Sequence, residues 1–171
     1  MKILLIFVFL IGIQSVAGQT KLPRFNDYPV KVYRGKIHKP KWLRRGSEGE
    51  WRDSQNKLVG DPVVDFAGKY HVGGHSLGTG VRYYSLTDLT TGRELDVFDR
   101  FATTEPIPKL RDGRDFLTVI YTRPNSRLII AQYFIDYMMQ PNPECRERSF
   151  IFENGKVRPI SKTIFKCRKL D

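Results

Sequence analysis

The sequence has few of the residues that most often bind metal or carry catalysis. Its 171 residues include two cysteines and three histidines, and neither H-E-x-x-H nor C-x-x-C occurs. His71 and His75 have a ligand spacing on a helix, but in the strand and loop expected here they need not converge. The phosphate loop G-x-x-x-x-G-K-[ST] is also missing, and the glycines between Gly73 and Gly80 fit a wide β-turn or bulge instead. We therefore expect no metal and no other cofactor.

Long apolar runs are missing everywhere except at the start of the chain. Lys2 precedes an apolar block over Ile3–Ile13, and a series of small residues follows as far as Gly18, the layout of a secretory signal peptide. A block of about eleven residues is too short for a membrane span, which needs about 20. We expect residues 1–18 to be cleaved after Ala17 or Gly18, with no cysteine following to accept a lipid. The mature protein is then periplasmic or secreted, without a transmembrane segment.

Acidic residues are outnumbered, with 18 Asp and Glu against 29 Lys and Arg and a formal net charge of +11. In a cytosolic protein this excess would suggest nucleic acid. Because export is predicted, we expect no nucleic acid and instead an acidic protein or an envelope polyanion, such as an anionic glycan, lipopolysaccharide or an acidic lipid surface. The simpler alternative is a solvated basic surface that aids solubility.

Cysteine is restricted to Cys145 and Cys167. The predicted export favours a disulfide between them, which would stabilise the fold by about 3 kcal/mol, mainly by restricting the unfolded chain. The alternative is a reactive thiol with a histidine base close by in space. The sequence contains no spacing that suggests one.

Residues 19–46 read as a basic, irregular arm. Its candidate binding residues mix aromatic rings with cations: Tyr33, Lys36, Lys39, Lys41, Trp42, Arg44 and Arg45. Such a mixture can stack on sugars or clamp phosphates and carboxylates. The alternative is a solvated tail with its aromatic rings packed on the sheet.

Residues 47–60 carry the signals of a short helix. Ser47 stands three residues before Glu50, the spacing of a capping box, and Gly60 closes the segment. Trp51 would be one of the packing residues of this helix.

Residues 61–171 read as an antiparallel β domain made of consecutive hairpins. Three pairs of segments rich in β-branched and aromatic residues flank the turns Thr90–Arg93, Arg123–Ser126 and Asn154–Gly155. The last is the dipeptide that most strongly predicts a two-residue hairpin turn. Apolar residues fill both faces of Leu128–Ile135, as expected of a buried central strand. The expected fold is mainly β, an antiparallel meander forming a small barrel or sandwich with one short N-terminal helix.

The pentapeptide GHSLG, Gly74 to Gly78, matches the G-x-S-x-G turn that carries the nucleophilic serine of many hydrolases. That turn connects a strand to a helix, whereas the residues after Gly80 read as strand, turn and strand. No histidine follows His75 either, so the chain order of that enzyme fold is impossible here. Ser76 remains a candidate nucleophile only with His38 or His71 in an unrelated geometry.

Several short motifs occur in the order found in a family of small, exported, functionally uncharacterised bacterial β proteins, which this chain resembles. The matching pieces are DFAGKY (65–70), LGTGV (77–81), DLTTGR (88–93), RPNSRL (123–128), CRERSF (145–150) and ENGK (153–156). Where the family pattern has two cysteines around G-T-G, this chain has Leu77 and Val81. That apolar exchange is expected if the family's cysteines form a buried disulfide, so no redox or metal role is carried over. The resemblance implies an exported β protein and no particular activity.

Three functional hypotheses follow. The first is a non-enzymatic exported protein that recognises another protein in an inhibitor-like or immunity-like role. The second is a cationic binder of envelope polyanions that uses the residues of the arm. The third is a small serine hydrolase with Ser76, or with a carboxylate pair that nothing in the sequence singles out.

Overall fold

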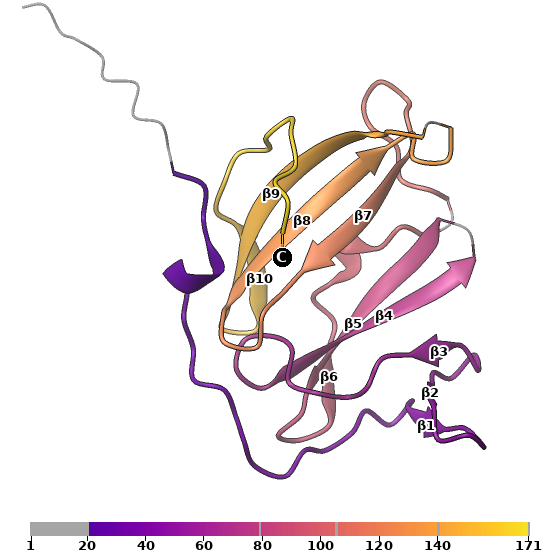
Figure 1. Cartoon of the computed structure of the whole chain (residues 1–171), viewed down its shortest axis with the longest axis vertical. Coiled ribbons are helices and arrows are strands. Elements are labelled where there is room, and N and C mark those ends of the chain that lie inside the picture. The colour runs from indigo at the N-terminus through magenta and orange to yellow at the C-terminus, as the bar shows by residue number, and fades with distance from the viewer. Residues whose placement is uncertain (1–20, 79, 105, 140, 171) are drawn as a thin grey trace, which may run out of the picture.

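The computed structural model describes residues 21–78, 80–104, 106–139 and 141–170, so the predicted signal peptide lies outside the described residues. The strands form three antiparallel sheets, and the two larger sheets face each other in a sandwich-like arrangement (Figure 1). The mainly β, antiparallel prediction is confirmed, and of its two forms the sandwich is the one observed. No helix in the described ranges has the length and apolar character needed to cross a membrane.

The larger sheet has the strand order β10-β9-β8-β7. Its strands are β7 (Phe116–Tyr121), β8 (Leu128–Ile135), β9 (Glu144–Glu153) and β10 (Lys156–Pro159). The predicted hairpins β7–β8 and β9–β10 are both present.

Two details of this sheet confirm the sequence signals. Asn154 and Gly155 have φ values of 51° and 71°, as a two-residue turn with both central residues at positive φ requires. Strand β8 lies between β7 and β9, and most of its residues are buried. Its continuous apolar run therefore reflects burial on both faces.

The second sheet has the strand order β4-β5-β6, with β4 at Tyr70–Gly78, β5 at Val81–Asp88 and β6 at Arg93–Leu95. The β4–β5 pairing shifts register between Ser76 and Gly78, and Gly78 has a positive φ of 144°. The predicted bulge is therefore present at the end of the glycine-rich stretch, whereas Gly73 and Gly74 lie within strand β4 and not in a wide turn.

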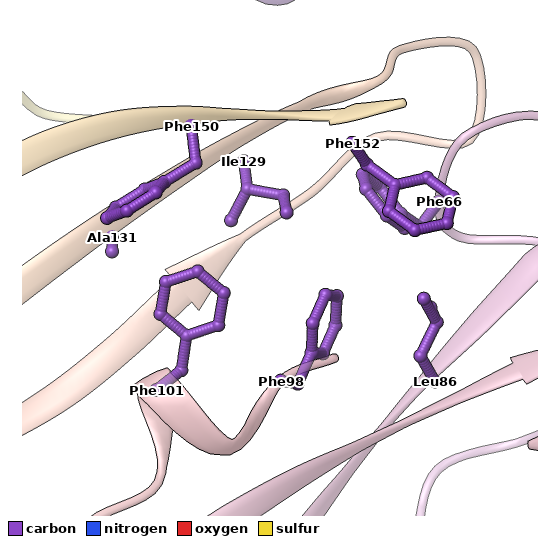
Figure 2. Close-up of a cluster of buried hydrophobic side chains, with 8 residues drawn as sticks. All are labelled: Phe66, Leu86, Phe98, Phe101, Ile129, Ala131, Phe150 and Phe152. Carbon is purple, nitrogen blue, oxygen red and sulfur yellow. The ribbon is translucent and has the colours of Figure 1, made fainter. Parts of the chain in front are cut away.

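The core fills the space between these two sheets (Figure 2). Its buried members are Phe66, Leu86, Phe98, Phe101, Ile129, Ala131, Phe150 and Phe152. Phe101 belongs to the 3-10 helix η2 (Asp99–Phe101), which contributes a ring from between the layers. Because side chains alternate along a strand, the other face of β4 and β5 is left for polar residues.

The helix predicted for residues 47–60 is wrong. The structure has a small third sheet there, with β1 at Arg44–Arg45, β2 at Trp51–Arg52 and β3 at Leu58–Val59. The turns between these strands place Gly49 at φ 85° and Asn56 at φ 64°, which no right-handed helix can contain.

Asp53 stabilises the second of these turns. Its Oδ1 accepts hydrogen bonds from the backbone N–H groups of Gln55 and Lys57, both at 2.9 Å. Ser47 and Glu50 do not form the predicted capping box. The Glu50 carboxylate instead accepts a hydrogen bond from the Glu48 N–H and forms an ion pair with Arg52. In the described residues the helical elements are two short 3-10 helices, η1 (Phe25–Asp27) and η2.

The described part of the basic arm is fixed to the sandwich by backbone hydrogen bonds. The N–H groups of Val30, Tyr33 and His38 donate to the carbonyls of Asn125, Gly68 and Leu89 at 2.9, 2.6 and 2.8 Å. A Cβ on Gly68 would lie 2.5 Å from the Lys31 carbonyl oxygen, so this glycine allows the arm to pass closely. The backbone of the arm from residue 21 onward is therefore docked on the sandwich, and this fixes the points from which its cationic side chains extend.

Candidate functional site

Ser76 does not occupy the turn that a hydrolase nucleophile requires. It lies in β4 opposite Arg82 of β5, so the chain passes from strand to strand around it. Its exposed hydroxyl donates a long hydrogen bond of 3.4 Å to the Gly78 carbonyl. Without a helix N-terminus after the serine, the oxyanion-binding amides of that motif are not formed at this turn.

A different serine lies in a chain of hydrogen bonds with an acid and a histidine. His75 Nδ1 is 3.1 Å from Asp53 Oδ2, and His75 Nε2 is 2.9 Å from Ser85 Oγ. Asp53 comes from the β2–β3 turn, His75 from β4 and Ser85 from β5. This is the order of contacts found in serine hydrolase triads, acid to Nδ1 and Nε2 to hydroxyl. These three residues were not predicted as a site, because β4–β5 pairing brings His75 beside Ser85 and only docking of the small sheet adds Asp53.

Aromatic rings enclose this hydrogen-bonded chain. The His75 ring stacks on Tyr83 with a centroid distance of 4.4 Å and meets the edge of Trp42 at 4.7 Å. Gly73, opposite Ser85, leaves room for the contact, because a Cβ there would lie 2.5 Å from Ser85 Oγ. His75 and Asp53 are each only 3% exposed, whereas Ser85 is half-buried. The histidine therefore links the small sheet to the outer face of the β4–β5 hairpin.

Asp53 is the charged member of this chain. Burial raises the pKa of its carboxyl, but hydrogen bonds from the Lys57 N–H, His75 and the Gln55 N–H outweigh burial and leave the pKa below its ordinary value. Nearby, burial raises the pKa of Glu94 and, together with the charges of Asp53 and Glu94, the pKa of Tyr83. Asp53 is thus a carboxylate at neutral pH and can accept a hydrogen bond from His75 Nδ1–H.

The second buried histidine has a separate acidic partner. His71 Nδ1 lies 2.8 Å from Asp65 Oδ2, and Asp65 Oδ1 accepts the Val72 N–H at 2.8 Å. His71 and His75 therefore each contact one carboxylate and do not converge. In the described residues, no three His, Cys, Asp or Glu side chains are grouped as a metal site would need.

The seven candidate residues of the arm fall into two groups. The side chains of Lys36, Lys39, Lys41, Arg44 and Arg45 are exposed, whereas Tyr33 and Trp42 are half-buried. Tyr33 donates its hydroxyl to the Lys36 carbonyl at 3.1 Å, and Trp42 packs on His75. Trp42 therefore anchors the arm on β4, Tyr33 stabilises a turn within the arm, and the five cations are exposed.

Trp51, which was not among the predicted binding residues, lies beside two of the exposed cations of the arm. Lys39 Nζ lies 4.3 Å from the centroid of the Trp51 ring, and Arg45 Cζ lies 5.1 Å from it. We call Lys39, Arg45 and Trp51 the Trp51 cluster. The predicted helix would have made Trp51 a packing residue, whereas its place in β2 brings it beside the two cations.

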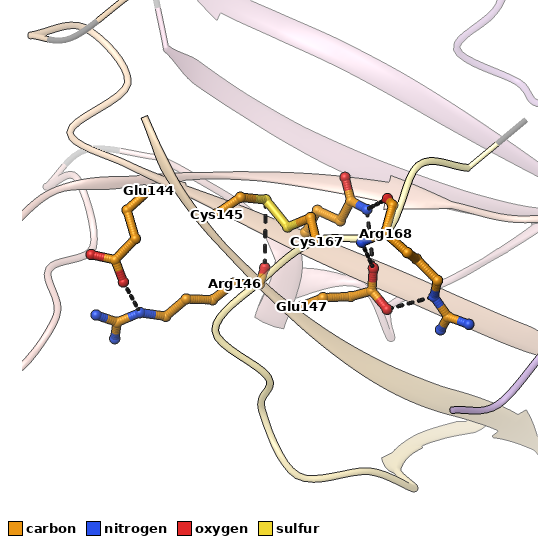
Figure 3. The surroundings of a disulfide bond; sticks show 7 residues. Glu144, Cys145, Arg146, Glu147, Cys167 and Arg168 are labelled. Atoms are coloured by element: carbon orange, nitrogen blue, oxygen red, sulfur yellow. Dashed lines mark hydrogen bonds and ion pairs between the residues drawn. A yellow bond between two sulfur atoms is a disulfide. The ribbon is translucent and has the colours of Figure 1, made fainter. Parts of the chain in front are cut away.

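The predicted disulfide between Cys145 and Cys167 is present (Figure 3). It connects β9 to the C-terminal segment, with 5.5 Å between the two Cα atoms. The alternative of a reactive thiol is therefore wrong, because no free cysteine remains.

Comparisons with protein-family models, with curated proteins and with solved structures find no match. The resemblance to exported bacterial β proteins therefore stays a prediction from the motif order.

Proposed function

We propose that this chain is an exported, non-enzymatic binding protein that recognises an acidic partner protein through the exposed cations of its arm. The observation that carries the proposal is the Trp51 cluster, in which two cations are held beside an aromatic ring. Lys36, Lys41 and Arg44 extend the same segment with exposed positive charge. Clusters of Trp and Arg with defined positions are typical of binding hot spots.

Docking of the arm supports this proposal energetically. The backbone hydrogen bonds at Val30, Tyr33 and His38 hold the segment before any partner arrives. A pre-ordered segment loses less conformational entropy on binding than a free tail does. A compact β scaffold with a fixed basic surface suits an inhibitor-like or immunity-like role toward an exported acidic protein.

Binding to acidic probes tests the proposal. Fluorescence anisotropy with a labelled decaglutamate peptide should give an affinity that weakens as salt is raised from about 50 to about 200 mM, since exposed charges are screened. The variant Lys39→Gln/Arg45→Gln should bind several-fold more weakly. The control Arg111→Gln/Lys156→Gln removes the same charge from exposed positions outside the arm and should bind like the wild type.

If both double variants lose decaglutamate affinity equally, net charge alone explains the binding, and the proposal is contradicted. A heparin fragment and lipopolysaccharide form a second arm of the same experiment. If they bind much more tightly than decaglutamate and depend on the Trp51 cluster, the partner is an envelope polyanion instead. Genes for a secreted toxin or hydrolase beside this gene would supply a specific acidic partner to test.

Export is part of the proposal and has its own measurement. The disulfide supports an oxidising compartment. Protein recovered from the periplasm or medium of a secreting host should have the intact mass of a chain cleaved after Ala17 or Gly18. Retention of the first 17 residues in the exported protein would contradict signal-peptide cleavage.

The hydrogen-bonded chain Asp53–His75–Ser85 favours a second candidate function, serine hydrolysis with Ser85 as nucleophile. His75 is placed to accept the Ser85 proton, and Asp53 is placed to hold the histidine ring. A fluorophosphonate probe should then label the wild type and Ser76→Ala but not Ser85→Ala. Absence of labelling in the wild type would remove this candidate.

A further inference from the structure

The two ends of the described chain meet beside β9. Arg168 Nη1 donates to the Pro23 carbonyl at 2.6 Å. Arg168 Nε forms an ion pair of 2.7 Å with Glu147, which is only 1% exposed (Figure 3). The disulfide holds the C-terminal segment at the neighbouring position. These contacts bring basic residues from opposite ends of the sequence to one place.

A cavity of about 840 Å³ lies between the two ends. One wall includes Lys21 and Leu22, the other includes Ile160, Lys162 and Ile164, and Arg148 of β9 also lines it. This volume is within the range of about 300–1,000 Å³ typical of pockets for small molecules.

The charge around this cavity has one sign. Lys21, Arg148 and Lys162 line it, and none of the residues that line it is acidic. Within the described residues these three cations form no ion pairs. The contrast is clear on β9 itself, where Arg146 pairs with Glu144 at 2.6 Å while the half-buried Arg148 has no carboxylate. The cavity therefore favours an anion.

Apart from Ser161 and Tyr28, the remaining residues that line the cavity are apolar. Leu22 at the rim is 36% exposed, and Ile160 and Ile164 are half-buried. An inorganic anion would leave these side chains without a contact, whereas an anion that carries an apolar chain would cover them. The combination fits an amphipathic anion better than either charge or apolar surface alone would.

The wall from the C-terminal segment is held in place without a ligand. Ile164 and Glu147 exchange two backbone hydrogen bonds of 2.9 Å, and the Ile160 N–H donates to the Ser149 carbonyl at 3.0 Å. The Ser149 N–H donates to Ser161 Oγ, and Arg148 Nε donates to the Ser161 carbonyl. A preformed wall lowers the ordering cost of binding.

We propose that this cavity binds a single-chain amphipathic anion, with a carboxylate or phosphate headgroup at Lys21, Arg148 and Lys162 and its apolar chain along Leu22, Ile160 and Ile164. The site shares no residue with the Trp51 cluster, so it is a function additional to recognition of an acidic partner. The headgroup chemistry is common to free fatty acids and to lysophospholipid-like phosphates.

Isothermal titration of the protein expressed from its full sequence tests the proposal, with ligands kept below their micelle concentrations. Dodecanoate and dodecyl phosphate should each bind one per chain with Kd values of about 10–100 μM. Dodecyl maltoside, which lacks the charge, and inorganic phosphate, which lacks the chain, should bind at least tenfold more weakly. The tighter of the two anions identifies the headgroup.

Variants locate the site. Lys21→Glu/Lys162→Glu should weaken dodecanoate about tenfold or more by reversing two charges, and Leu22→Ser should weaken it by shortening the apolar wall. Lys57→Glu/Lys156→Glu, with the same charge change at exposed positions outside the cavity, should bind like the wild type. Lys39→Gln/Arg45→Gln should also leave dodecanoate binding unchanged, which separates this inference from the arm proposal.

Absence of dodecanoate and dodecyl phosphate binding to the wild type would overturn the inference. Equal affinity in the Lys21/Lys162 variant and its control would do the same, as would dodecyl maltoside binding as tightly as the anions. If the variants are misfolded by circular dichroism, amide shifts of the wild type decide instead. Shifts confined to residues 21–28 and 159–164 and to Arg148 with its neighbours on β9 support the cavity, and shifts elsewhere contradict it.

Discussion

Gly73 shows how one residue decides what the outer face of β4 and β5 can hold. A Cβ at this position would lie 2.5 Å from Ser85 Oγ, 3.0 Å from His75 Nε2 and 3.3 Å from the Trp42 ring. The neighbouring Gly74 has no such constraint, because its Cβ would be 3.8 Å from the Tyr84 ring. Two adjacent glycines in the same strand therefore have different roles.

Substitution of these two glycines separates the roles. We expect Gly73→Ala to lower the free energy of unfolding by about 1–3 kcal/mol, since the added methyl group overpacks the His75 contact. Gly74→Ala should change it by less than about 1 kcal/mol, in either direction. Urea unfolding followed by tryptophan fluorescence gives both values, and equal effects of the two substitutions would contradict the packing described here.

Asp53 links stability to pH at the same place. Because its pKa in the folded state is below the ordinary value, its contribution to stability is full above pH about 4 and is lost as pH falls through the folded-state pKa. Asp88 acts in the same sense, while Glu94, whose pKa is raised, acts in the opposite sense. We expect the unfolding free energy to decrease between pH about 5 and about 3, and less steeply in Asp53→Asn.

Urea titrations across this pH range measure that slope. Asp61→Asn, at an exposed carboxylate outside the hydrogen-bonded chain, serves as the control and should keep the wild-type slope. An unchanged slope in Asp53→Asn would mean that Asp53 does not couple folding to proton binding.

At the scale of elements, the long hairpins were predictable and the short ones were not. Asn154–Gly155 is a turn whose two positive φ values almost require these residue types, so the local sequence predicts the β9–β10 hairpin. In residues 47–60 each strand has only two residues, too few for a period-two pattern, and the local capping signal pointed to a helix instead. Contacts with the rest of the molecule, including Asp53 with His75, favour the hairpins.

Asn56 distinguishes the hairpin from the helix experimentally. At φ 64° a β-branched residue is strained by about 1–2 kcal/mol, whereas glycine is not. We therefore expect Asn56→Val to lower the unfolding free energy and Asn56→Gly to leave it nearly unchanged. A helix would give a different order, because glycine is the worse residue in a helix interior. Thermal unfolding of the two variants decides between them.

At the scale of the whole molecule, the fold brings the two ends of the described chain, near Pro23 and Arg168, together. The disulfide, the Arg168–Glu147 ion pair and the Arg168 contact to Pro23 all lie at this junction. Cations of the C-terminal segment thereby lie near cations of the N-terminal segment, although the two segments are far apart in the sequence.

Removal of the disulfide measures the strength of this junction. We expect Cys145→Ser/Cys167→Ser to lower the unfolding free energy by about 3 kcal/mol, since the unfolded chain regains the freedom of a loop with a sequence separation of 22. The wild type under reducing conditions should lose a similar amount. If the unfolding free energy falls in the double variant but not in the reduced wild type, the serine substitutions themselves cause the loss of stability. Dodecanoate affinity should change less than stability does, because hydrogen bonds of Ile160, Ser161 and Ile164 with β9 still hold that wall of the cavity.

The mainly β fold class and the main hairpins could be predicted from the amino-acid sequence. Apolar alternation, the buried run of β8 and the Asn154–Gly155 turn are local properties, and the pairing of Cys145 with Cys167 followed from there being two cysteines in a chain predicted to be exported. The three-dimensional fold was needed to show that Asp53, His75 and Ser85 touch, that Trp51 stands beside Lys39 and Arg45, and that both ends of the described chain line a cavity. The contact of Asp53 with His75 and the cavity depend on segments far apart in sequence, whose relative placement no local pattern encodes. The contact of Trp51 with Arg45 depends on pairing of the two-residue strands β1 and β2, which are too short to leave a pattern.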